Sequence, residues 1–175
     1  MQHTLIAVMQ DRPGVLNRAV SLFRRRGFNI DSLAVASTEV PGLSRMTVVV
    51  NRDDVTQVVQ QLQRLVDIVS VQDVTFDRAV AQEMCLVRVG PPGSRLAEIL
   101  GLAREFDARV VDASPSAMVL AIMDAPATIS AFLERVQRFG IEEITRSGRI
   151  AMSMTTPARG ARPSPNASAA SASTA

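Results

Sequence analysis

The sequence of 175 residues contains no lysine, tryptophan or tyrosine, one histidine and one cysteine. All 19 basic residues are arginines, so no lysine can form a Schiff base or bind a phosphate in a nucleotide-binding loop. The remaining catalytic candidates are His3, Cys85, carboxylates and hydroxyls. His3 lies beside the terminus and Cys85 lies in an apolar stretch, so we expect neither to have a partner suited to nucleophilic or metal chemistry. The sequence therefore predicts a protein without a catalytic site of its own.

Long apolar runs and an excess of charge are also missing. No segment reaches the roughly 18–20 apolar residues of a membrane span, and Met1–Thr4 lacks the basic and apolar regions of a signal peptide. Two of the 19 arginines, Arg159 and Arg162, follow residue 156, which leaves 17 arginines against 17 acidic residues before it. Every aromatic residue is a phenylalanine, so a basic face with stacking aromatics is not expected. We expect a cytoplasmic protein that binds neither membranes nor nucleic acid.

The first half of the chain shows strand and helix patterns in the order βαββαβ. Apolar and β-branched residues bounded by turn residues predict strands at 3–10, 28–38, 45–50 and 68–76. A helix is predicted between the first two strands, with Pro13 in its first turn and Gly27 closing it after three arginines. A second helix, capped by Asp53 or Asp54, carries an apolar stripe that ends at Val66.

The second half repeats this order. Strand patterns lie at 84–89, 109–112, 118–123 and within 141–154, with helix patterns after Gly93 and after Pro126. The apolar helix positions of the two halves match at one constant offset: Leu16, Val20 and Phe23 correspond to Ile99, Ala103 and Phe106. The chain therefore resembles an internal duplication.

These patterns predict an α+β protein with two ferredoxin-like βαββαβ domains, residues 1–77 and 78–156. The linker is placed at 77–80, unless the strand continues through it. Residues 157–175 contain only Pro, Ala, Arg, Gly, Ser, Thr and Asn, which bury too little apolar area to offset the entropy of ordering. We expect this tail to be disordered.

One loop, Asp11-Arg12-Pro13-Gly14, has the composition of a ligand site. A helix that follows a strand directs several unpaired backbone amides outward, and such amides suit a carboxylate. Gly14 lets ligand atoms approach where a side chain would otherwise stand, and the oxygens of Asp11 can accept hydrogen bonds from an ammonium group. Together these groups suit an amino acid, although the same residues also occur in ordinary strand-to-helix turns.

Three stretches closely resemble the small regulatory subunit of acetolactate (acetohydroxyacid) synthase. They are residues 11–16 (DRPGVL), residues 25–33 (RRGFNIDSL) and residues 43–47 (LSRMT). In the second half, residues 112–115 (DASP) and 145–148 (TRSG) are also similar to that family. The resemblance spans nearly all of residues 1–156.

The resemblance implies an N-terminal ACT domain and a C-terminal ACT-related, ferredoxin-like domain. It implies a homodimer that activates a catalytic large subunit and confers feedback inhibition by valine in branched-chain amino acid biosynthesis. The chain itself is then expected to bind no cofactor, while thiamine diphosphate, FAD and Mg belong to the catalytic partner. In that family the effector lies between the first domains of two chains.

The resemblance also implies the effector-binding residues. On one side of the site stand Asp11, Gly14, Leu16 and Asn17, and on the other stand Asn29 and Ile30. Many family members have Asn in place of Asp11 and Ser in place of Asn17, so the affinity for the effector is open. A negative Asp11 favours the ammonium group but repels a carboxylate that lies close to it. For Asn29 a purely structural role, closing the turn after Gly27, is the alternative.

Other functions use the same strand order, so the fold alone does not decide. An RNA-recognition module needs aromatics on its central strands, whereas four of the six phenylalanines lie on apolar helix stripes. A small phosphatase needs free amides in loops where this chain has Pro13 and Pro91-Pro92. The alternative that stays open is an ACT-type amino-acid sensor that controls a different enzyme or regulator.

Overall fold

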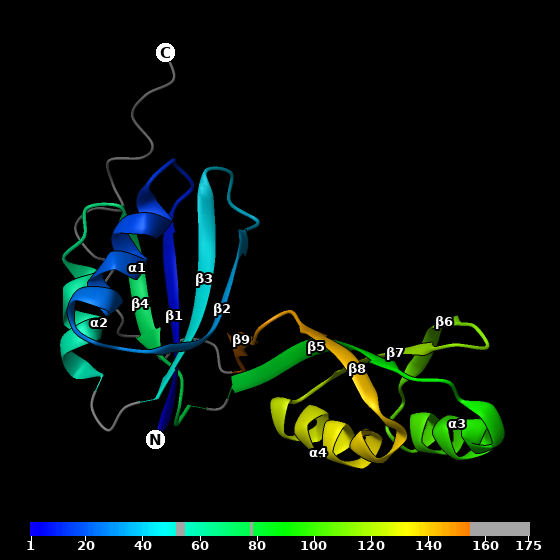
Figure 1. Cartoon of the computed structure of the whole chain (residues 1–175). Helices are drawn as coiled ribbons and strands as arrows, with labels where there is room; N and C mark the ends of the chain where they lie inside the picture. Colours follow the sequence, from blue (N-terminus) through cyan, green and yellow to red (C-terminus); the bar gives the residue numbers. More distant parts are fainter. Residues whose placement is uncertain (52–54, 78, 155–175) are drawn as a thin grey trace. The chain divides into compact units, whose positions relative to one another are not determined.

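The computed structural model describes residues 1–51, 55–77 and 79–154. The described residues divide into two compact units, one formed by residues up to 80 together with 151–154 and the other by residues 81–150. Each unit has a β-sheet with two α-helices packed on one face (Figure 1). No helix in the described part is long and apolar enough to cross a membrane. The predicted tail, 157–175, and the predicted helix caps Asp53 and Asp54 lie outside the described residues.

The first unit has the predicted βαββαβ order. Its elements are β1 (Gln2–Gln10), α1 (Val15–Arg25), β2 (Ile30–Ser37), β3 (Leu43–Asn51), α2 (Thr56–Gln63) and β4 (Ile68–Asp73). The strands form an antiparallel sheet in the order β2-β3-β1-β4. Alternate residues of β1 and β3 face the helices, because successive side chains of a strand point to opposite faces. Leu5 and Val48 from these strands pack with Phe23 of α1 and Leu62 of α2.

One predicted helix end in this unit is confirmed, whereas two elements end earlier than predicted. Gly27 adopts a φ of 66° after basic residues in the last turn of α1, which confirms the predicted left-handed closure. Val66 was expected on the apolar stripe of the second helix but is 81% exposed, because α2 ends at Gln63. Phe76 was expected in a strand but is 77% exposed, because β4 ends at Asp73.

The second unit repeats the order and builds a separate core. Its elements are β5 (Ala79–Val89), η1 (Gly93–Arg95), α3 (Leu96–Glu105), β6 (Arg109–Ala113), β7 (Met118–Asp124), α4 (Pro126–Val136), η2 (Gln137–Phe139) and β8 (Ile141–Arg146). The last strand, β9 (Ile150–Ser153), has most of its residues in the first unit. The sheet order is β6-β7-β5-β8, and β9 also pairs with β5. Because β5 begins at Ala79, the strand continues into the residues assigned to the linker. Leu120, Phe132 and Cys85 are buried at the centre of this core, as expected for Cys85.

Candidate functional site

The loop between β1 and α1 is the best-formed candidate site in the first unit. The amide of Asp11 donates to the carbonyl of Gly42 at 2.8 Å, and the amide of Val15 donates to the carbonyl of Arg12 at 3.3 Å. Gly14 stands at the N-cap of α1 with a φ of 85°, a left-handed conformation that glycine adopts without strain. Residues 11–14 are all exposed. The loop is thus fixed by its backbone and open to solvent.

This loop leaves amides free at the start of α1. The amide of Arg18 is the first in α1 to form the i→i−4 hydrogen bond of an α-helix. It donates to the carbonyl of Gly14 at 3.0 Å. Within the described residues, the amides of Gly14, Leu16 and Asn17 have no acceptor, and no side chain caps the helix. Free amides at a helix N-terminus carry partial positive charge and bind anions. The four residues predicted on this side of the site, Asp11 included, therefore lie together.

Arg18 adds a cationic group that the sequence did not indicate. Its Nε and Nη2 donate to Asp67 Oδ2 at 3.0 and 2.5 Å, which holds one edge of the guanidinium against the chain just before β4. The other nitrogen, Nη1, lies 3.4 Å from the position that a Cβ on Gly14 would occupy. The carbonyl of Asp67 also accepts from the amide of Gln10 at 2.9 Å, so the ion pair is tied to the base of the loop.

The other two predicted residues lie at the far end of the same sheet. Ile30 pairs with Val50, which pairs with His3 near the start of β1, whereas the loop follows the end of that strand. Asn29 is exposed, and its side-chain Nδ2 donates to Asp31 Oδ1 at 3.0 Å rather than closing the preceding turn. Within one chain the two predicted halves of the site are therefore apart.

His3 lies in a buried polar cluster with an acidic partner. His3 is 6% exposed, and its Nδ1 lies 2.9 Å from Asp73 Oδ2. Thr75 donates to Asp73 Oδ1 from its hydroxyl and, at 3.0 Å, from its amide. A hydrolytic triad needs a nucleophile at the second ring nitrogen, but His3 Nε2 is buried and has no partner in the described part of the chain. The cluster joins the start of β1 to the end of β4, and its Thr75 hydroxyl lies 3.4 Å from His3 Nδ1, the nitrogen that already contacts Asp73, rather than at Nε2.

Asp73→Asn is expected to reduce the loss of stability in acid. Burial opposes ionisation of Asp73, but the hydrogen bonds from Thr75 and the contact with His3 outweigh it and lower the pKa below the ordinary 3.8. A lowered pKa in the folded state stabilises the fold at pH above 3.8, and this contribution is lost as the pH falls through the lower value. Urea unfolding from pH 7 down to pH 3 measures it. Asp77→Asn, at an exposed aspartate, is the control, and equal acid slopes for wild type and Asp73→Asn would contradict the assignment.

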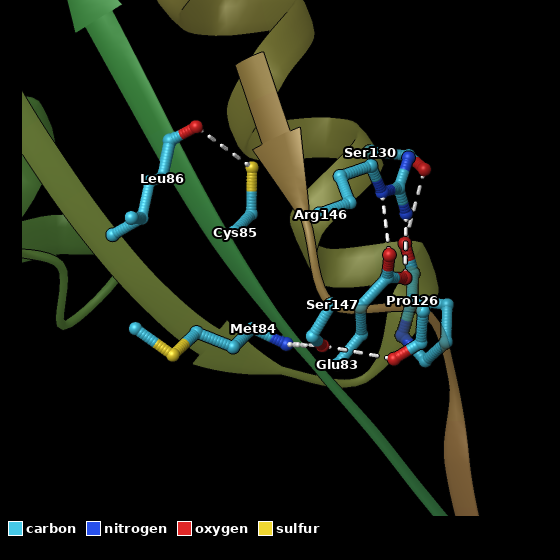
Figure 2. A network of polar contacts seen from close by, with 9 residues as sticks. Glu83, Met84, Cys85, Leu86, Pro126, Ser130, Arg146 and Ser147 are labelled. Atoms are coloured by element: carbon cyan, nitrogen blue, oxygen red, sulfur yellow. Dashed lines mark hydrogen bonds and ion pairs between the residues drawn. The ribbon is translucent and has the colours of Figure 1, made fainter. Parts of the chain in front are cut away.

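An ion pair of the second unit joins a buried carboxylate, Glu83, to an arginine, Arg146, whose side chain is 38% exposed (Figure 2). Arg146 donates from Nε and Nη2 to the two oxygens of Glu83 at 2.6 and 2.7 Å, and Glu83 is 6% exposed. Cys85 of β5 stands directly opposite Arg146 of β8. Burial raises the pKa of the Cys85 thiol; the charge of Arg146 opposes this and that of Glu83 adds to it. A buried thiol with a raised pKa is a poor nucleophile, so this network joins two strands rather than supplying chemistry.

The described residues form no metal-ion cluster, and a groove on the second unit holds no acid–base pair. No group of three or more His, Cys, Asp or Glu side chains is close enough to hold a metal ion within residues 1–51, 55–77 and 79–154. A shallow groove of about 650 Å³ between α4 and β8 is lined by Ser130, Leu133, Glu134, Gln137, Ile141 and Ile144. A single carboxylate among apolar and uncharged residues provides no acid–base pair.

Comparison with protein families accounts for both units. Residues 5–70 match the AHAS small subunit-like ACT domain, and residues 82–155 match the model of the small subunit of acetolactate synthase. The chain belongs to the acetolactate synthase small-subunit family. The two ferredoxin-like domains and the ACT assignment of the first are thereby confirmed.

Named relatives and a solved structure cover most of this chain. The Archaeoglobus fulgidus protein named "Probable acetolactate synthase small subunit" is 42% identical over 154 residues, 87% of this chain and 96% of its own. The acetolactate synthase small subunit of Mycolicibacterium smegmatis is 37% identical over 153 residues, 86% of this chain and 90% of its own. A crystal structure of the small subunit from Thermotoga maritima superposes with a TM-score of 0.80 at 32% identity, covering 89% of this chain and 99% of that one.

Membership of the family implies a catalytic subunit as partner. The residues of the small subunit that the sequence did not indicate are Arg18 and Asp67 beside the loop, and Asp73 beside His3. Arg18 follows Gly14 by four positions, which places the two residues on one face of the helix. That spacing could have indicated Arg18 as a residue near the loop, whereas the position of Asp67 depends on tertiary contacts.

Proposed function

We propose that this chain is the regulatory subunit of an acetolactate synthase, and that it activates the catalytic subunit and confers inhibition by valine. The observation that supports this most directly is the set of free amides at Gly14, Leu16 and Asn17 in a unit that matches the AHAS small subunit-like ACT domain. The chain works without a catalytic site of its own. Thiamine diphosphate, FAD and Mg are held by the partner, and the complex is cytoplasmic.

The groups around the loop complement an α-amino acid with an apolar side chain. The carboxylate of valine binds at the free amides, where the helix terminus and Arg18 Nη1 favour negative charge. The carboxylate of Asp11, which is exposed, accepts hydrogen bonds from the ammonium group. Leu16 is 38% exposed beside these polar groups and contacts the isopropyl group.

A second copy of the chain completes this site. Asn29 and Ile30 lie at the opposite end of the sheet from the loop, so one chain does not bring the two sets together. In the proposed homodimer, the loop of one chain faces Asn29 and Ile30 of the other. Valine bound between two chains stabilises the arrangement that it fits, and the catalytic subunit responds to that arrangement.

Reconstitution with the catalytic subunit from the same host tests the proposal. The chain alone is expected to form no acetolactate from pyruvate, with or without thiamine diphosphate. Added to the catalytic subunit, it is expected to raise the rate severalfold and to make that rate fall as valine is titrated. Leucine and isoleucine titrations define which side chains the site accepts.

Two results would contradict the proposal. Turnover by the pure chain would place a catalytic site in it. Unchanged activity of the catalytic subunit after addition of the chain would show a different target, and recovery of a transcription regulator with the native protein would identify an amino-acid sensor of another kind.

A further inference from the structure

The guanidinium of Arg18 lies beside the free amides at the start of α1. Arg18 follows Gly14 by four positions, and side chains at this spacing share one face of a helix. Side chains of a helix also lean toward its N-terminus, which carries the guanidinium back along the loop. Its Nη1 lies 3.4 Å from the position that a Cβ on Gly14 would occupy. A positive group therefore stands where the loop leaves room for a ligand.

Only one edge of this guanidinium is used within the described part of the chain. Nε and Nη2 donate to Asp67 Oδ2 at 3.0 and 2.5 Å. An arginine side chain carries five N–H donors in a rigid planar fork, and the two on Nη1 are not part of the edge that Asp67 occupies. Nη1 has no acceptor among the described residues, and the side chain is 52% exposed. Two charged donors thus remain for a group outside the chain.

Asp67 holds the arginine in this orientation. Its side chain is 18% exposed, and its carbonyl accepts from the amide of Gln10 at 2.9 Å, at the end of β1. The carboxylate is therefore attached to the strand from which the loop starts. An unpaired arginine samples many rotamers and loses this freedom when it binds a ligand, whereas Arg18 is already ordered by its ion pair. Ordering before binding favours affinity.

We propose that Arg18 determines the specificity of the valine site for an ionised carboxylate, and that Asp67 is its positioning residue. Backbone amides donate to a neutral carbonyl oxygen as well as to a carboxylate, so the free amides of Leu16 and Asn17 discriminate less between the two. A hydrogen bond from a guanidinium to a carboxylate is roughly twice as strong as a neutral one. Arg18 therefore selects a free amino acid over an amine or amide with the same side chain. This inference rests on the proposed function and names the group that carries its charge selectivity.

The other charges of the loop favour the same assignment. Asp11 is exposed in the loop, and its negative charge favours the ammonium group of an amino acid but opposes the carboxylate. A cation close to the helix terminus offsets this repulsion. Arg12 is the other cation of the loop, but its side chain is exposed and has no partner among the described residues that fixes it. Arg18, held by Asp67, is the better placed of the two.

Binding of two ligands to the full-length chain tests the assignment. Titration calorimetry measures valine and valinamide, in which a neutral carboxamide replaces the carboxylate. Wild type is expected to bind valine at least about tenfold more tightly, and Arg18→Gln to bring the two affinities within about threefold of each other, with the loss confined to valine. Arg24→Gln is the matched control, because it removes the same charge from an exposed arginine in the last turn of α1. It is expected to leave both affinities unchanged.

Asp67→Asn tests the positioning role. The change keeps the shape of the side chain but removes the charge that fixes the guanidinium. We expect it to reduce the preference for valine severalfold when Arg18 is present, and to have no further effect on that preference in the Arg18→Gln background. A merely structural role of Asp67 at the base of the loop would instead weaken the binding of both ligands equally in both backgrounds.

Three results would overturn the assignment of Arg18. They are a wild-type chain that binds valine and valinamide equally, an Arg18→Gln chain that keeps the preference for valine, and an equal loss of preference in Arg12→Gln or Arg24→Gln. Valine inhibition of the reconstituted enzyme is recorded separately. Valine binding without inhibition refutes the proposed function and leaves the assignment of Arg18 to the binding data, whereas inhibition with an unchanged preference in Arg18→Gln refutes Arg18 alone. A wild-type chain that binds no valine contradicts both.

Discussion

Gly14→Asp is expected to abolish inhibition at valine concentrations that inhibit the wild-type complex, while activation at zero valine persists. The new carboxylate would begin at a Cβ only 3.4 Å from Arg18 Nη1 and beside the free amides of Leu16 and Asn17. It would therefore occupy the groups proposed to bind the valine carboxylate. A charge at a helix N-terminus contributes about 0.3–2 kcal/mol, and about 1.4 kcal/mol already shifts affinity tenfold.

The fold is expected to tolerate this change. Residue 14 has a φ of 85°, so any side chain there costs some strain, but Asp is among the residues that accept a left-handed conformation most readily. A negative charge at the start of α1 also stabilises the helix dipole. We propose that the catalytic subunit binds a surface other than this loop, which is why activation is expected to persist.

Valine titrations of the reconstituted enzyme measure the effect, with the rate at zero valine recorded for each variant. Gly14→Ala separates the strain of a Cβ from the effect of the carboxylate and is expected to shift the inhibition curve less. Gly93→Asp is the matched control, because Gly93 also has a positive φ, of 46°, and precedes a helix with open space around it. An unchanged curve for Gly14→Asp would remove Gly14 from the site, and loss of activation together with inhibition would show that the two functions share a surface.

The sequence predicted those parts of the fold that depend on neighbouring residues. Gly27 marks the end of α1 because a left-handed residue closes a helix, and the β-branched run within 45–50 marks β3. The loop at Gly14 could also be predicted from the sequence, since a glycine between a strand and a helix is a local pattern. In each case the physical cause lies within a few residues of the feature.

Residue pairs whose contact depends on strand register could not be predicted in this way. His3 and Asp73 meet because β1 and β4 are neighbours in a register that pairs Leu5 with Asp73. The apolar and β-branched runs mark the strands, but they do not show which residues of two distant strands stand opposite each other. The ion pair of Arg18 with Asp67 is missed for the same reason, since its partners are 49 positions apart.

Phe132→Ala is expected to destabilise the second unit by about 3–5 kcal/mol, the usual loss for deletion of a buried aromatic ring. Phe132 is 0% exposed on α4, and its ring lies 5.4 Å from that of Phe106 between ring centres. A domain has a total stability of about 0.05–0.15 kcal/mol per residue, and the second unit spans only residues 81–150. The loss is therefore comparable with the whole stability of that unit.

Native-state hydrogen exchange, read separately for peptides of the two units, measures this effect. Each hydrophobic cluster draws its residues from one unit only, so protection is expected to fall in α4 and β7 and to persist in β1 and β3. Phe76→Ala, at a phenylalanine that is 77% exposed, is the control and is expected to cost at most about 1 kcal/mol. Phe132→Leu, which keeps most of the buried volume, should lie between the two. An equal loss of protection in both units after Phe132→Ala would show that the two cores unfold as one, which would contradict their energetic independence.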